Sequence, residues 1–214
     1  MVKKMKDLII VAAGSQAREL LQFAKDINTV TPTWNIKGFI ADGGDDIYEL
    51  TNHEYSILSS IDEWKPNDNE EFVVAISAPD RKRKVVQELQ NKGAHFATLI
   101  HPTAHIDDYS TYGKGLIMYP NSTIGVNSKI GDFVTVCGGI AHDNVIGDYV
   151  TLSGDATLSG HVSVGEGSFF GAKSIVAPNL KIGSNAFICI GSVVIRNVRD
   201  NTKVIGNPAK RLDF

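Results

Sequence analysis

The second half of the chain carries an apolar residue at every sixth position. These positions form two uninterrupted series. They are Ile106, Tyr112, Met118, Ile124, Ile130 and Val136 in the first, and Ile146, Leu152, Leu158, Val164, Phe170, Val176, Ile182, Ile188 and Val194 in the second. Glycine often follows the apolar position, and serine or alanine recurs four residues after it. This period is typical of a parallel β-helix, in which three hexads form one triangular coil and the apolar side chains fill the interior.

The two series are out of register with each other. Ten residues separate Val136 from Ile146, where an unbroken repeat would have six or twelve. The intervening segment contains Gly138 and Gly139, which favour a departure of the chain from the coil. Binding and catalytic residues lie disproportionately in such irregular loops. We therefore expect a functional loop within residues 137–145.

This segment contains His142, followed directly by Asp143. A histidine side chain exchanges protons near neutral pH, which suits a general base, and a neighbouring carboxylate can hold it in one tautomer. The alternative is a turn histidine whose nitrogens are satisfied by ordinary hydrogen bonds. His161 follows nineteen residues later, about one coil along, so it could line the same face.

Composition changes near residue 100. Residues 1–100 hold five of the 20 glycines and 27 charged residues, whereas residues 101–214 hold fifteen glycines and 18 charged residues. The first part also alternates apolar runs with helical patterns. We expect strands at 7–14, 36–41, 72–76 and 96–100, and helices at 17–27 and 80–91. The chain is therefore predicted to have an α/β, Rossmann-like domain over residues 1–100 and a β-helix with a C-terminal cap over residues 101–214.

The turn after the first expected strand contains Gly14, Ser15 and Gln16. Only one glycine of a G-x-G-x-x-G motif is present, but the amides that open the next helix still suit a phosphate. Asp42 ends the second expected strand, where such folds place an acid that binds ribose. The alternative is that all four are ordinary turn residues.

Composition excludes several other classes. The chain has 21 Lys+Arg against 24 Asp+Glu, which provides no basic surface for nucleic acid. No apolar run approaches the roughly 20 residues of a membrane span. The two cysteines, Cys137 and Cys189, have no disulfide-framework or metal-ligand spacing, and a reducing cytoplasm fits them.

Two further segments are specific: Ala141-His-Asp-Asn-Val-Ile-Gly-Asp148 and Val204-Ile-Gly-Asn-Pro-Ala-Lys210. With the hexads and the short α/β unit, they make the whole chain resemble the hexapeptide-repeat sugar acyltransferases of bacterial surface-glycan pathways. That family includes sialic-acid O-acetyltransferases and N-acetyltransferases of nucleotide-linked 4-amino sugars. The resemblance implies a left-handed β-helix, a homotrimer, and acetyl-CoA bound in a groove between neighbouring β-helices.

The resemblance also implies roles for individual residues. His142 matches the catalytic base and Asp143 the acid that follows it. Four positions match the acetyl-CoA groove: Gly160, Ala172, Ile190 and Thr151, the last standing where some members have a second histidine. Gly14, Ser15, Gln16 and Asp42 match the sugar-nucleotide site. The first turn departs from the glycine-rich pattern of the family, because Ala12, Ser15, Gln16 and Ala17 occupy four of its positions.

We therefore expect an acetyl-CoA-dependent N-acetyltransferase that acts directly, without a metal, on the amine of a nucleotide-linked 4-amino-deoxy sugar. The first alternative is O-acetylation of sialic acid or a related sugar. The second is an enzyme like the γ-carbonic anhydrases, which need three histidines around zinc. The third is a non-enzymatic scaffold.

Overall fold

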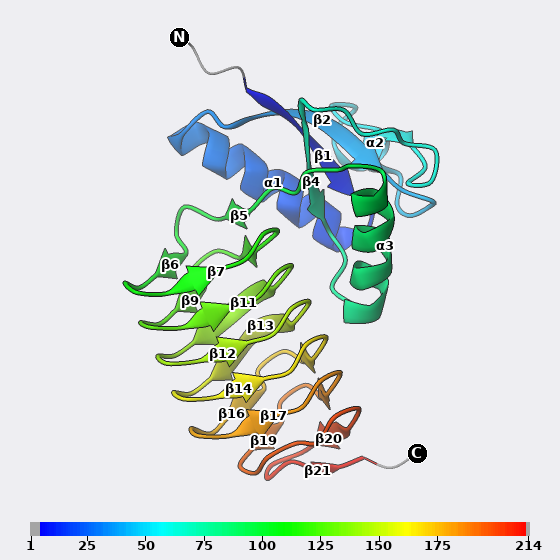
Figure 1. Cartoon of the computed structure of the whole chain (residues 1–214). Coiled ribbons are helices and arrows are strands. Elements are labelled where there is room, and N and C mark those ends of the chain that lie inside the picture. Colours follow the sequence, from blue (N-terminus) through cyan, green and yellow to red (C-terminus); the bar gives the residue numbers. More distant parts are fainter. Residues whose placement is uncertain (1–4, 213–214) are drawn as a thin grey trace. The chain divides into compact units, whose positions relative to one another are not determined.

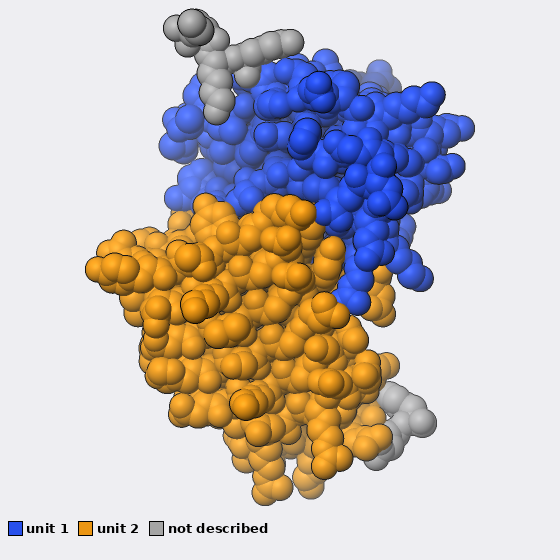
Figure 2. Space-filling view, in the orientation of Figure 1, with its two compact units in different colours: residues 1–77, 81–102 blue, residues 78–80, 103–214 orange. Residues whose placement is uncertain are grey.

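The computed structural model describes residues 5–212 and divides into two compact units (Figure 2). One unit comprises the chain up to Ser77 together with Arg81–Pro102. The other comprises Ala78–Asp80 together with the chain from Thr103 onward.

The first unit is built on a parallel sheet of four strands. They are β1 (Lys6–Val11), β2 (Trp34–Ile40), β3 (Ile57–Ser59) and β4 (Glu70–Val74), in the order β3-β2-β1-β4. The central strand β1 pairs with both β2 and β4, and Leu8, Ile9, Ile10 and Val11 are at most 1% exposed. Burial on both faces explains why this strand is a continuous apolar run rather than an alternating one.

Three helices accompany this sheet: α1 (Ser15–Val30), α2 (Ile47–Leu50) and α3 (Pro79–Asn91). α1 buries Ala17, Leu20, Leu21, Phe23 and Ala24, which lie on one side of an amphipathic helix. Among residues 5–212, no helix has both the length and the apolar character that a membrane crossing requires.

Two predictions for this unit differ from the structure. The strand expected at 96–100 is reduced to a single bridge between Phe96 and Phe72 and the two-residue β5 (Leu99–Ile100). The opposite edge of the sheet, beside β2, is formed by β3, which the sequence did not predict. β3 is only three residues long, and Ile57 and Leu58 are exposed, so it has neither the length nor the burial pattern of a recognisable strand.

The second unit is a parallel β-helix whose coils stack along one axis (Figure 1). Its strands form three faces. The first face contains β7 (Thr111–Tyr112), β10 (Lys129–Ile130), β12 (Val145–Ile146), β14 (Ser163–Val164) and β17 (Lys181–Ile182). The second contains β8 (Ile117–Met118), β15 (Phe169–Phe170), β18 (Phe187–Ile188), β20 (Lys203–Ile205) and the antiparallel β21 (Lys210–Arg211). The third contains β6 (His105–Ile106), β9 (Thr123–Ile124), β16 (Ile175–Val176) and β19 (Val193–Val194).

Two longer strands, β11 (Thr135–Ile140) and β13 (Thr151–Leu158), run from the second face into the third. Their first residues pair with β8 and β15, and their last residues pair with β9 and β16. These two strands therefore join two faces within the same coils.

The hexad positions form the interior, as predicted. From Met118 to Val194, every apolar residue of the two series is at most 5% exposed. Small residues pack beside them, and Ser128, Ser168, Ser174 and Ser192 are completely buried. The prediction is wrong for Tyr112, which is 47% exposed, because β7 is the first strand of its face and has no coil before it.

The register break is a shortening of one coil, not a loop. Paired residues are eighteen apart in most coils, as in Ser163 with Lys181, but Thr135 pairs with Thr151, sixteen residues away. The two missing residues fall between Val136 and Gly138, where the pairing with β13 shifts register. Ile140 then supplies the interior position and is 1% exposed. The expected departure of the chain from the coil is therefore wrong.

The shortened coil requires glycine at position 138. A β-carbon added to Gly138 would lie 2.8 Å from the backbone nitrogen of Ala156 in the next coil, which is closer than real side chains approach. The glycine that suggested a loop in fact allows two strands to come unusually close.

Candidate active site

One corner of the β-helix is formed by residues in the left-handed backbone conformation. Asn127, Asp143, His161 and Asn179 have φ of 59°, 58°, 58° and 63° in successive coils. The backbone links them, because His161 N–H donates to the His142 carbonyl and Asn179 N–H to the Gly160 carbonyl, each at 3.1 Å. Asn, Asp and His are the non-glycine residues that best tolerate this conformation.

His142 and Asp143 therefore lie at an ordinary corner. The expectation that they mark an irregularity of the repeat is wrong, since the shortening ends at Ile140 and the coil is regular again before His142. Their exposure comes from the corner itself: the side chains of His142 and Asp143 are 53% and 31% exposed.

The carboxylate of Asp143 holds the imidazole of His142. Nδ1 of His142 lies 2.7 Å from Oδ2 of Asp143, and the Asn127 side-chain amide donates to Oδ1 at 2.6 Å. The hydrogen bond from Asn127, followed by that from His142, lowers the pKa of Asp143 from its ordinary value of 3.8. An ionised carboxylate only accepts, so the proton of a neutral His142 lies on Nδ1 and the free lone pair on Nε2.

Gly160 packs against this imidazole. A β-carbon at Gly160 would lie 2.6 Å from Nε2 of His142, so the ring occupies space that is open only because this residue is glycine. The structure thus brings together two of the predicted site residues, His142 and Gly160, across neighbouring coils.

His161 shares the same corner. Its Nε2 lies 3.6 Å from Oδ2 of Asp143, and its ring meets that of His142 edge-on with centroids 5.3 Å apart. The sequence analysis considered that His161 could line the same face as His142, and the structure places the two rings in contact.

The other residues predicted for acetyl-CoA lie elsewhere on the β-helix. Ala172 and Ile190 belong to another corner, where Gly191 N–H donates to the Ala172 carbonyl at 2.9 Å. Ile190 is 71% exposed there. Thr151 lies on β13, 2% exposed, between Thr135 and Phe169 of the neighbouring strands. Within a single chain, these three residues therefore lie away from the corner that contains His142.

The first turn of the α/β unit has an alanine in a backbone conformation that favours glycine. This residue, Ala12, has a φ of 87°, and Gly14 is the N-cap of α1 without a side-chain cap. Ser15 and Gln16 open the helix. Gly44 packs over this turn, since a β-carbon there would lie 2.9 Å from that of Ala13.

Asp42 follows β2, as predicted, but one of its oxygens has a structural partner. The backbone N–H of Ile61 donates to Oδ1 of Asp42 at 2.9 Å. The loop that follows Asp42 is also held in place, because Asp45 forms an ion pair with Arg18 of α1. These contacts hold the loop after β2 beside the turn after β1, where an open α/β sheet binds its ligands.

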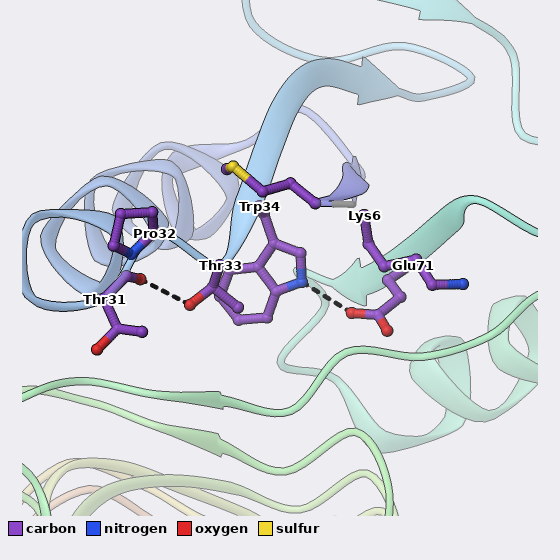
Figure 3. A pocket seen from close by; sticks show the side chains of 7 residues that line it. Lys6, Thr31, Pro32, Thr33, Trp34 and Glu71 are labelled. Carbon is purple, nitrogen blue, oxygen red and sulfur yellow. Dashed lines mark hydrogen bonds between the residues drawn. The ribbon is translucent and has the colours of Figure 1, made fainter. Parts of the chain in front are cut away.

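A separate pocket lies at the opposite ends of these strands, where β1, β2 and β4 begin (Figure 3). It has a volume of about 370 Å³ and is lined by Lys6, Thr31, Pro32, Trp34 and Glu71 among others. The Trp34 indole donates to Glu71 at 2.8 Å. Because ligands of such sheets bind at the carboxyl ends of the strands, this pocket is unrelated to the predicted nucleotide site.

The sequence analysis missed Asn127. It is sixteen residues before Asp143, the length of the shortened coil, so the eighteen-residue spacing of the other coils does not identify it as the neighbour of the carboxylate. The signal was present in the ten-residue break, but it required Ile140 to be recognised as an interior position.

Comparisons with known proteins agree with this architecture. No protein-family model matches the chain. GDP-perosamine N-acetyltransferase from Escherichia coli O157:H7 is 33% identical over 148 residues, which cover 66% of this chain and 67% of that protein. The acetyltransferase domain of PglB from Neisseria gonorrhoeae, solved with acetyl coenzyme A, superimposes with a TM-score of 0.87 at 22% identity, covering 98% of this chain and all of that one. A variant of perosamine N-acetyltransferase from Caulobacter crescentus, solved with CoA and GDP-perosamine, gives 0.86 at 22% identity, covering 99% of both chains.

The chain therefore belongs to the hexapeptide-repeat acetyltransferase family. The predicted fold class, an α/β unit followed by a left-handed β-helix, and the predicted enzyme class, an acetyltransferase, are both confirmed.

Proposed function

We propose that this enzyme transfers the acetyl group of acetyl-CoA to the amine of a nucleotide-linked 4-amino-deoxy sugar. The observation that carries the proposal is the His142 imidazole, held by Asp143 through Nδ1 and packed through Nε2 against Gly160. An amine acceptor is supported by the Escherichia coli relative, whose name specifies N-acetylation of a GDP-linked amino sugar.

In this mechanism His142 is the general base. Nε2 accepts a proton from the amine as the amine nitrogen attacks the thioester carbonyl carbon. Asp143 stabilises the imidazolium that forms. When the tetrahedral intermediate collapses, the carbon–sulfur bond breaks and the imidazolium returns the proton to the departing CoA sulfur. The backbone N–H of Gly160 is our candidate donor to the oxyanion. No protein residue is acylated, and no metal takes part.

The acetyl-CoA site is proposed to lie between chains of a homotrimer. His142 and Gly160 occupy one corner, whereas Ala172 and Ile190 occupy another. A groove between neighbouring β-helices would combine the two corners, with Thr151 also near CoA. This arrangement predicts that a monomeric variant loses acetyl-CoA binding even though each chain still contains every residue.

The sugar nucleotide is proposed to bind at the carboxyl edge of the α/β sheet. The helix-opening amides of Ser15 and Gln16, after Gly14, would face its phosphates, and the free oxygen of Asp42 would accept from the ribose. We place the reaction in the cytoplasm, because two cysteines without a disulfide framework suit a reducing compartment.

A thiol-release assay tests the proposal. The enzyme is incubated with acetyl-CoA and, in separate reactions, GDP- and UDP-linked 4-amino-deoxy sugars, sialic acids, or no acceptor. We expect CoA release with a nucleotide amino sugar and an amide in the product by mass spectrometry. Release with sialic acid alone would instead establish O-acetylation. Near-normal turnover by a folded His142→Ala variant would refute the assignment of the base.

A further inference from the structure

Three metal-ligating side chains converge at the active-site corner. One nitrogen from each of His142 and His161 and a carboxylate oxygen of Asp143 all lie within 4.8 Å of one another. We infer that this group binds a zinc ion reversibly, and that the bound ion inhibits the enzyme.

The spacing of the donors suits a single ion. Nδ1 of His142 and Nε2 of His161 lie 2.7 Å and 3.6 Å from the same oxygen, Oδ2 of Asp143. Zinc binds imidazole nitrogen and carboxylate oxygen at about 2.0–2.2 Å, so its ligand atoms are about 3.3 Å apart in a tetrahedral site. Small rotations of these exposed side chains satisfy that requirement.

The backbone already fixes the positions of the three ligands. Asp143 and His161 are held at successive corners by the coil hydrogen bonds, including that from His161 N–H to the His142 carbonyl. Asn127 holds the other carboxylate oxygen at 2.6 Å, which leaves Oδ2 for the ion. A ligand set already assembled loses little conformational entropy on binding.

The donor set selects the type of metal. Two imidazoles and one carboxylate suit zinc and related transition metals, whereas magnesium and calcium prefer oxygen ligands. The side chains of His142 and His161 are 53% and 56% exposed, so an ion reaches them from solvent and the fourth position stays open to water.

A bound ion would block the general base, a consequence that rests on the proposed function. An ion on Nδ1 of His142 replaces the proton there, and a neutral imidazole then carries its proton on Nε2. Nε2 can no longer accept a proton from the acceptor amine. The ion also withdraws the Asp143 carboxylate that stabilises the imidazolium.

Calorimetric titration of the full chain with zinc chloride in metal-free buffer tests the site. We expect one ion per chain in the wild type. His161→Asn removes one ligand and suits the left-handed corner, where Asn127 and Asn179 occupy the equivalent positions. It should weaken binding by more than about tenfold, because even the outer-shell partners of metal ligands contribute that much.

A matched control is His105→Asn. His105 is also exposed and pairs with a carboxylate, that of Asp107 at 2.8 Å, but residues 5–212 place no third ligand there. It should leave zinc affinity unchanged. Zinc binding that is absent from the wild type, or unaffected by His161→Asn, would overturn the site.

Inhibition is measured separately, as the fraction of each variant's own metal-free rate that remains at a given zinc concentration. We expect His161→Asn to require at least about tenfold more zinc, and chelation to restore the wild-type rate. Binding without inhibition would overturn the inhibitory role. Calorimetry needs no acetyl transfer, so failure of the proposed function would leave the zinc site tested.

Discussion

The imidazole of His142 occupies the place where Gly160 would carry a side chain. An added β-carbon would lie 2.6 Å from Nε2, the nitrogen left free when Nδ1 is bound to Asp143. This contact between successive coils therefore fixes the position of the His142 imidazole relative to the backbone of Gly160.

Gly160→Ala should lower kcat strongly while the protein stays folded. The exposed His142 ring can swing into solvent to make room, so the cost falls on its orientation. We expect a loss of about 10² in kcat, at the low end of what general-base catalysis contributes. Thiol-release kinetics and thermal unfolding measure the two effects. Gly139→Ala is the control, because its β-carbon would meet only the Thr123 hydroxyl, at 3.4 Å. Equal kcat values for the two variants would contradict the role of this contact.

The interior of the β-helix could be predicted from sequence because two-residue strands send one side chain inward in each hexad. His142 and Asp143 could be predicted to interact because they are adjacent. The three-hexad coil of eighteen residues also places Gly160 beside His142 in the next coil. The contact of Asp143 with Asn127 could not be predicted, since it depends on a coil of sixteen residues. The missing two residues were misread as a loop because Ile140 lies outside both six-residue series.

Asn127→Gly should lower kcat modestly. The change removes the amide that donates to Oδ1 of Asp143 but keeps a residue suited to a φ of 59°. Because the carboxylate keeps its charge and its contact with His142, we expect kcat to fall only about three- to tenfold. Asn179→Gly makes the same change at another left-handed position of this corner and should have no such effect. If both variants lose activity equally, the loss reflects the corner and not the carboxylate.

Ala12→Gly should stabilise the α/β unit. At a φ of 87° alanine is strained by about 1–2 kcal/mol, whereas glycine is penalised only by about 0.5–1 kcal/mol of chain entropy. We expect a gain of about 0.5–1 kcal/mol in the free energy of unfolding, measured by urea denaturation. Ala13→Gly, at a neighbouring buried alanine without positive φ, should be destabilising. A loss of stability in Ala12→Gly would show that its methyl group has a packing role.

Asp143→Asn should remove a pH-dependent contribution to stability. Because the hydrogen bonds from Asn127 and His142 lower the pKa of Asp143 in the folded state, its carboxylate stabilises the fold above its ordinary pKa of 3.8. That contribution disappears as the pH falls through the lowered value. The difference in unfolding free energy between wild type and Asp143→Asn should therefore shrink as the pH falls below about 4. Urea denaturation at each pH measures it. A difference that grew below about pH 4 would mean that the pKa of Asp143 is raised in the folded protein, and that it does not hold His142 as a carboxylate.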